Sequence, residues 1–69
     1  MELKNNLRRL RFNANEMTQQ ELADKLQVSR QTIYAIEKGK FNPSVRLAIH
    51  MAELFDVAVE DIFYLNREG

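Results

Sequence analysis

The stretch TQQELADKLQVSRQTIYAIEKGK, residues 18–40, decides the fold of this chain. Thr18 and Glu21 have the spacing of a capping box, in which each side chain bonds the backbone amide of the other residue. Ser29 is a second good N-cap residue. The sequence therefore predicts two helices, about residues 18–26 and 30–38, joined by a turn of about three residues.

Apolar residues at helical spacing join these two helices, and they are Leu22, Leu26, Val28, Ile33 and Ile36. The small Ala23 allows a close approach, and Gly39 suits a left-handed helix end. Two helices joined by so short a turn form a helix-turn-helix, whose DNA-binding version places its second helix in the major groove. A plain helical hairpin has the same pattern, so the spacing alone leaves both readings open.

The outward face of residues 30–38 favours DNA. Arginine can donate two hydrogen bonds to guanine, glutamine pairs with adenine, and the methyl groups of threonine and alanine suit thymine. No acidic side chain points outward here, although the chain holds ten acidic residues. The outward residues are Arg30, Gln31, Thr32, Tyr34, Ala35 and Lys38.

Three further helices are expected, over about residues 4–13, from Pro43 and Ser44 to Phe55, and over about residues 59–63. The last of these begins after Ala58, a poor N-cap residue. The tail, residues 64–69, is open to three readings: frayed, extended, or part of a dimer contact. The predicted fold is all-α, a single five-helix domain over residues 1–69 with a short C-terminal tail.

Composition excludes several functions. The chain has 69 residues, no cysteine and one histidine, His50, so it offers no cysteine-ligated zinc site and no nucleophile with a base beside it. We therefore expect a protein that is not an enzyme and that binds no metal and no cofactor. The apolar runs are too short for a transmembrane helix and the N-terminus does not resemble a signal peptide, so a cytoplasmic protein is expected.

The formal net charge of zero argues at first against nucleic-acid binding, whose usual mark is a basic balance. The charges are unevenly spread, however. Residues 1–11 and 30–46 each carry a net charge of +3, whereas residues 12–29 carry −2 and residues 47–69 carry −4. The basic segments include the predicted DNA-reading helix, so the segregation fits DNA binding better than the total does.

Residues 18–40, followed by NPSVRLAIHMAELFDVAVEDIF at residues 42–63, resemble the XRE-like family of phage Cro and repressor proteins and their bacterial and archaeal relatives. With the first helix, the resemblance covers nearly the whole chain. It implies a five-helix, lambda-repressor-like domain that binds operator DNA, commonly as a dimer, and regulates transcription.

The resemblance also implies residue roles. Base reading falls to Arg30, Gln31, Thr32, Tyr34 and Ala35, and contacts with the DNA backbone fall to Gln19, Ser29, Lys38, Lys40 and Asn42. Gln19 is further expected to brace Arg30. Arg11 and Glu37 match a structural pair that fixes the first helix against the third.

Two copies related by a two-fold axis would place their reading helices about 34 Å apart and would require a near-palindromic operator in double-stranded DNA. The candidate dimer residues are Val59, Phe63, Tyr64 and Leu65, with packing on the domain's own core as the alternative. We expect a homodimeric repressor without a small-molecule ligand. A protein-interaction module of the same fold, an antitoxin or a bridging cofactor, is the second hypothesis.

Overall fold

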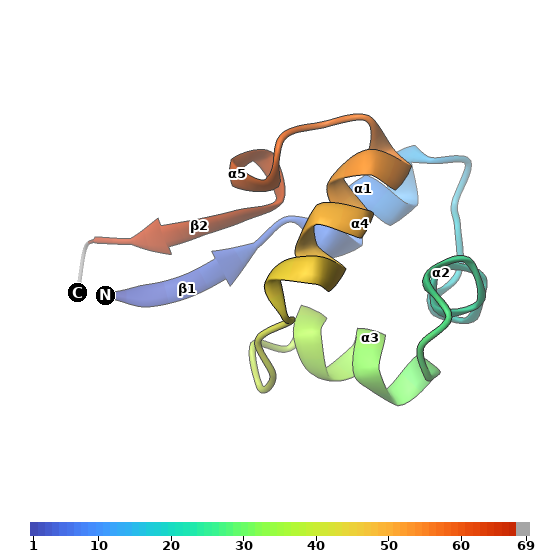
Figure 1. The fold of residues 1–69 in the computed structure, drawn as a ribbon, viewed down its shortest axis with the longest axis horizontal. Helices are drawn as coiled ribbons and strands as arrows, with labels where there is room; N and C mark the ends of the chain where they lie inside the picture. The colour runs from blue at the N-terminus through green and yellow to red at the C-terminus, as the bar shows by residue number, and fades with distance from the viewer. Residues whose placement is uncertain (68–69) are drawn as a thin grey trace.

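The computed structural model describes residues 1–67, and over these residues it contains five helices and one two-stranded antiparallel sheet (Figure 1). The predicted five-helix, lambda-repressor-like arrangement is confirmed. In chain order the elements are β1 (Glu2–Asn5), α1 (Leu7–Asn13), α2 (Gln19–Leu26), α3 (Arg30–Glu37), α4 (Val45–Phe55), α5 (Val59–Ile62) and β2 (Phe63–Asn66).

The two-stranded sheet is a departure from the all-α expectation. β1 and β2 pair antiparallel, from Glu2 opposite Asn66 to Asn5 opposite Phe63. The prediction of a helix over residues 4–13 was wrong at its start, because α1 begins only at Leu7 and the preceding residues alternate between exposed and half-buried positions, as a strand does. The extended reading of the tail is confirmed for residues 64–66, while Glu68 and Gly69 of that tail lie outside the described residues.

Side-chain caps begin the helices where the sequence placed them. Thr18 Oγ1 accepts a hydrogen bond from the Glu21 amide at 3.0 Å, and the Thr18 amide donates to Glu21 Oε1 at 2.9 Å, which completes the predicted capping box. Hydrogen bonding of the Glu21 carboxylate to Thr18, first to its backbone amide and then to its side chain, holds the pKa of Glu21 below its ordinary value. Ser29 and Ser44 cap α3 and α4 in the same manner through their hydroxyl oxygens. The caps thus fix the start of each helix around the turn.

Left-handed residues end three of the helices. Gly39, at φ +75°, ends α3, and the Lys40 amide then donates to the Ala35 carbonyl at 2.9 Å. Gln27 and Asp56 end α2 and α4 in the same conformation without being glycine, at φ 58° and 56°. The ends of α2 and α3 therefore set the length of the turn and of the exposed surface of α3.

α5 has no side-chain cap from its N-cap residue. Ala58 has no side chain that can accept, so only the reciprocal half of a capping box forms, with the Ala58 amide donating to Asp61 Oδ2 at 3.0 Å. The helix ends at Ile62, and Phe63, which was expected in it, begins β2. Ile62 is fully buried, so packing rather than capping holds this turn in place.

One core joins the helices, and its buried members are Leu7, Leu22, Ala23, Leu26, Ile33, Ile36, Met51, Ala52 and Ile62. In Figure 1 α3 lies below α4 and α2 lies to one side, while the paired strands β1 and β2 project to the other side. This leaves the lower surface of α3 uncovered. Within residues 1–67, no helix has the length and apolar character needed to cross a membrane.

Candidate nucleic-acid interface

The start of α3 is held in place by α2. Ala23 is fully buried between the two helices, and its carbonyl accepts from the Val28 amide at 3.0 Å, which closes the end of α2. Ile33 and Ile36 bury the inner face of α3. The opposite face is therefore directed outward by the packing of the helix pair, as the helix-turn-helix interpretation requires.

Four of the predicted DNA-contacting residues of α3 are exposed, namely Arg30, Gln31, Tyr34 and the C-cap residue Lys38. Thr32 and Ala35 are half-buried at the margin of this face. The Thr32 and Ser29 hydroxyls lie 2.9 Å apart and bond each other, so Thr32 presents its methyl group more freely than its oxygen.

Two hollows adjoin the exposed face of α3. One is lined by Gln19, Arg30, Gln31 and Tyr34. The other is lined by Arg8, Arg11, Gln19, Tyr34, Glu37 and Lys38. Gln19 and Tyr34 border both, so the first residue of α2 and the middle of α3 form one continuous surface. The Lys38 ammonium lies 5.7 Å from the centre of the Tyr34 ring, within the range of a cation–π contact.

The expected structural pair is present. Arg11 Nε donates to Glu37 Oε2 at 2.6 Å, and its second nitrogen, Nη2, donates to Oε1 at 3.0 Å. Arg11 Nη1 also donates to the Met17 carbonyl at 2.7 Å. The hydrogen bonds to Glu37 raise the pKa of Arg11 further above its ordinary value. One guanidinium thus joins α1, the loop before α2 and the end of α3.

Gln19 differs from its expected role beside Arg30. Its amide nitrogen donates to Glu37 Oε1 at 3.1 Å, so the side chain braces the end of α3 rather than its beginning. Glu37 is the only acidic residue of α3, and its carboxylate is enclosed by Arg11 and Gln19 with the side chain 7% exposed. The exposed face of α3 is therefore left without an uncompensated negative charge.

Lys40 and Asn42 lie exposed in the loop after α3 and line neither hollow. Arg8, in contrast, was not singled out from the sequence, yet it borders the hollow that contains Tyr34 and Lys38. Its spacing of three residues from Arg11 places both on one side of α1, which is the signal that could have found it.

Residues 7–62 match the family model described as Helix-turn-helix. The chain belongs to the XRE helix-turn-helix family. A Methanocaldococcus jannaschii protein named an uncharacterized HTH-type transcriptional regulator is 56% identical over 61 residues, which cover 88% of this chain and 91% of that protein. A Bacillus subtilis protein of the same description is 38% identical over 67 residues, covering 97% of this chain and 100% of the relative.

A protein of Archaeoglobus fulgidus, again named an HTH-type transcriptional regulator, is 52% identical over 52 residues, or 75% of this chain and 74% of that protein. Membership of the XRE family makes this chain a DNA-binding, non-enzymatic regulator of transcription.

This XRE regulator also has exposed apolar residues outside α3. Of the candidate dimer residues, Val59 and Phe63 are half-buried against the core, whereas Tyr64 and Leu65 on β2 are 45% and 47% exposed. Two exposed apolar residues of α4 were not expected: Val45 and Ile49, which lie one helical turn apart. Packing on the core thus accounts for half of the candidate set and leaves the other half open.

We predict that Arg11→Met lowers the free energy of unfolding by about 3 kcal/mol, because it leaves the Glu37 carboxylate buried without its cation. Urea denaturation followed by circular dichroism measures this loss. The double variant Arg11→Met/Glu37→Leu should lose less than the single variant. As a control, Lys4→Ala removes the exposed Lys4–Glu2 pair and should cost less than about 0.5 kcal/mol. Equal losses for Arg11→Met and Lys4→Ala would contradict the assignment.

Proposed function

We propose that this regulator binds a near-palindromic operator as a homodimer, places α3 of each copy in the major groove, and represses transcription by blocking access of the polymerase. The observation that carries the proposal is the exposed face of α3, where Arg30, Gln31 and Tyr34 lie together and Glu37 is withdrawn into its bonds with Arg11 and Gln19.

Base reading is assigned to the first two turns of α3. Arg30 suits guanine O6 and N7, and Gln31 suits adenine N6 and N7, because each side chain can form two hydrogen bonds with that base edge. The methyl groups of Thr32 and Ala35 border the same face and suit the thymine methyl. Tyr34, half exposed in the middle of the helix, stands between these residues and Lys38.

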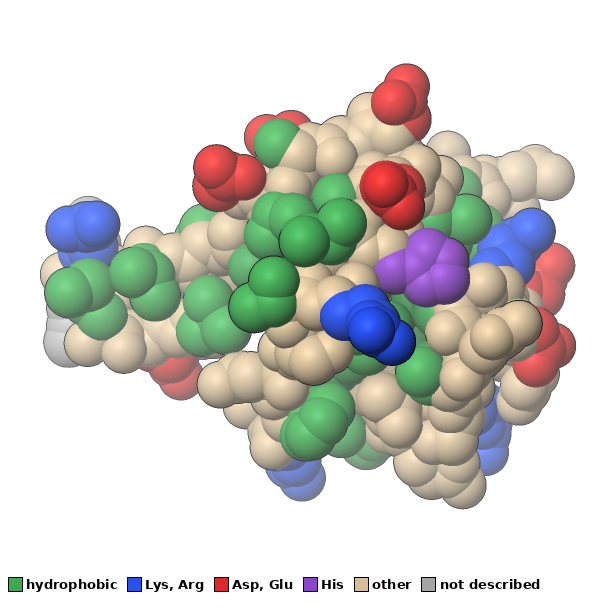
Figure 2. Space-filling model, viewed as in Figure 1, with side chains coloured by type: hydrophobic (Ala, Val, Ile, Leu, Met, Phe, Trp, Pro, Cys, Tyr) green, Lys and Arg blue, Asp and Glu red, His purple; other side chains and the backbone are tan. Residues whose placement is uncertain are grey.

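Contacts with the phosphate backbone are assigned to polar and basic groups around this face, which are Gln19, Ser29, Lys38, Lys40 and Asn42. Such contacts set the register of the protein on the duplex without carrying sequence information. Acidic side chains gather along the upper edge of Figure 2, over the end of α4 and over α5, away from α3. This polarity orients the domain as it approaches DNA.

A homodimer is supported by exposed apolar side chains on β2 and on α4. Val45 is 77% exposed and Ile49 is 48% exposed on α4, and Tyr64 and Leu65, which point to opposite faces of β2, are 45% and 47% exposed. In Figure 2 hydrophobic side chains extend from the paired strands β1 and β2 toward the middle of the molecule. A two-fold axis through this surface would bring the same residues of both copies together.

The main test is selection of bound duplexes from a random DNA pool. We expect enrichment of an inverted repeat whose half-sites are about 10 base pairs apart, centre to centre, since dimers of this class read successive major-groove turns. Absence of enrichment at low salt, together with a protein bound at the Arg30 face, would favour the protein-interaction module instead. Enrichment of a single unrepeated site would contradict the dimer and retain the DNA-reading helix.

On the selected operator, Arg30→Ala should weaken binding by about 1–3 kcal/mol and relax the preference at one base pair per half-site. Quantitative binding to the operator and to single-base variants measures both effects. Gln19→Ala is the comparison, because loss of a positioning contact weakens binding to all variants about equally. Arg30 would be a backbone contact if its variant lost the same affinity for operator and scrambled DNA.

Leu65→Glu should weaken the dimer by about 3 kcal/mol, roughly a hundredfold in dissociation constant, because each copy loses one partly buried leucine and gains a charge. Sedimentation equilibrium measures the constant. Glu53→Gln, another exposed position, is the control and should leave it unchanged. A monomeric wild-type protein at micromolar concentration, or an unaltered Leu65→Glu dimer, would contradict this interface.

A further inference from the structure

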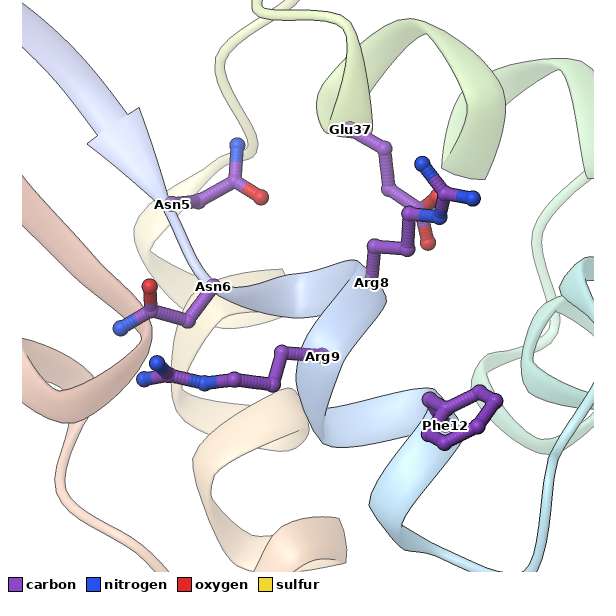
Figure 3. A pocket seen from close by; sticks show the side chains of 6 residues that line it. All are labelled: Asn5, Asn6, Arg8, Arg9, Phe12 and Glu37. Atoms are coloured by element: carbon purple, nitrogen blue, oxygen red, sulfur yellow. The ribbon is translucent and has the colours of Figure 1, made fainter.

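A groove beside α1 has a volume of about 500 Å³, and its walls are Asn5, Asn6, Arg8, Arg9, Phe12 and Glu37 (Figure 3). The volume lies within the range of sites that hold small molecules or a few side chains of a partner. The groove has no part in the assignments made so far, apart from Arg8 and Glu37 at the wall that it shares with the α3 hollow.

Three of the polar residues that line the groove already have hydrogen-bond partners within the fold. The Asn5 side-chain amide donates to the Ile36 carbonyl at 2.9 Å, and the Asn6 side-chain amide donates to the Asp61 carbonyl at 3.0 Å. Glu37 is held by Arg11 and Gln19. These groups therefore serve the fold, and the chemistry left for a ligand comes from the other three residues.

Those three residues are two arginines and an aromatic ring. Phe12 is 64% exposed, and within residues 1–67 neither Arg8 nor Arg9 forms an ion pair. In Figure 3 the two arginine side chains diverge, with Arg8 directed toward Glu37 and Arg9 toward Asn6. Two separated cations beside an uncovered ring match a ligand that carries carboxylates on either side of an apolar group.

We propose that this groove binds an acidic segment of a protein partner, with carboxylates on Arg8 and Arg9 and an aliphatic or aromatic side chain on Phe12. Charge complementarity selects this occupant, as in other acidic motifs that are bound by clustered arginines. A DNA phosphate chain fits less well, because it offers no apolar group to Phe12. Moreover, Arg9 and Phe12 line neither of the hollows at α3.

The position of Arg8 gives the groove a regulatory consequence, which rests on the proposed DNA binding. Arg8 borders both the groove and the hollow that contains Tyr34 and Lys38. A carboxylate on Arg8 removes one free cation from the surface that faces the phosphates. Partner and DNA then weaken each other's binding by the same factor, as linkage requires.

The first experiment uses the DNA-free protein. A random peptide library displayed on phage is selected on the immobilised full chain, and we expect enrichment of peptides that combine Asp or Glu with an aliphatic or aromatic residue. A synthetic peptide of the enriched sequence is then titrated calorimetrically. Phe12→Ala removes an apolar contact and Arg9→Glu removes a charge-assisted one, and each should weaken its binding about tenfold or more.

Lys25→Glu is the matched control, since it makes the same charge change on the exposed surface of α2 and should leave peptide binding unchanged. Phe12, Arg9 and Lys25 are all exposed, so thermal melts of the variants are expected to agree with that of the wild type. Enrichment without acidic residues, or equal binding by Arg9→Glu and Lys25→Glu, overturns the proposal.

The second experiment adds the peptide to the protein bound to its selected operator. We expect the peptide to lower the affinity of the wild-type protein for DNA, and to have no such effect on Phe12→Ala. If Arg9→Glu weakens DNA binding and leaves peptide binding intact, the groove is part of the DNA surface and the proposal fails. Because peptide binding is measured without DNA, failure of the DNA-reading assignment would not alter the first result.

Discussion

The bonds between Arg11 and Glu37 hold α3 in place against α1. Arg11 comes from α1 and Glu37 from the last turn of α3, and their contacts at 2.6 and 3.0 Å fix the angle between guanidinium and carboxylate, as bidentate pairs do. The same guanidinium holds the Met17 carbonyl, and Gln19 adds a bond to the same carboxylate. Three separate segments of the chain therefore meet at one anion.

This arrangement also has an electrostatic effect. An exposed carboxylate at the end of α3 would repel phosphates, yet the Glu37 side chain is 7% exposed and accepts two bonds from Arg11 and one from Gln19. Glu37 thus stabilises the fold without adding an uncompensated negative charge to the surface of α3. Net charge over the chain, which is zero, is for this reason a poor guide to binding.

Local features of this fold could be predicted because they depend on residues close together in the chain. Thr18, Ser29 and Gly39 determine where α2 and α3 begin and where α3 ends, and each acts within a few residues of itself. The buried faces follow from helical spacing in the same way. The pair of Arg11 with Glu37 came from family resemblance, since nothing in local spacing brings together residues 26 positions apart.

The features that were missed depend on distant partners or on strained backbone. β1 forms because Glu2–Asn5 meets Phe63–Asn66 at the other end of the chain, and a short segment containing Leu3 and Lys4 gives no local sign of that pairing. Gln27 and Asp56 adopt a left-handed conformation. A glycine at these positions would have predicted it, whereas glutamine and aspartate do not. Gln19 was placed beside Arg30, but its amide nitrogen donates to the Glu37 carboxylate, an acceptor that the guanidinium of Arg30, which only donates, cannot provide.

The sheet of β1 and β2 links the proposed dimer surface to α3. Asn5 ends β1, and its side-chain amide donates to the Ile36 carbonyl in the last turn of α3, while the Asn6 amide donates to the Ile62 carbonyl at the end of α5. Both bonds lie where β1 ends and β2 begins, and β2 carries Tyr64 and Leu65. In the proposed dimer through this sheet, the orientation of one α3 relative to the other would therefore be set through these two hydrogen bonds rather than through a flexible linker. We accordingly expect a fixed separation between the half-sites of such a dimer.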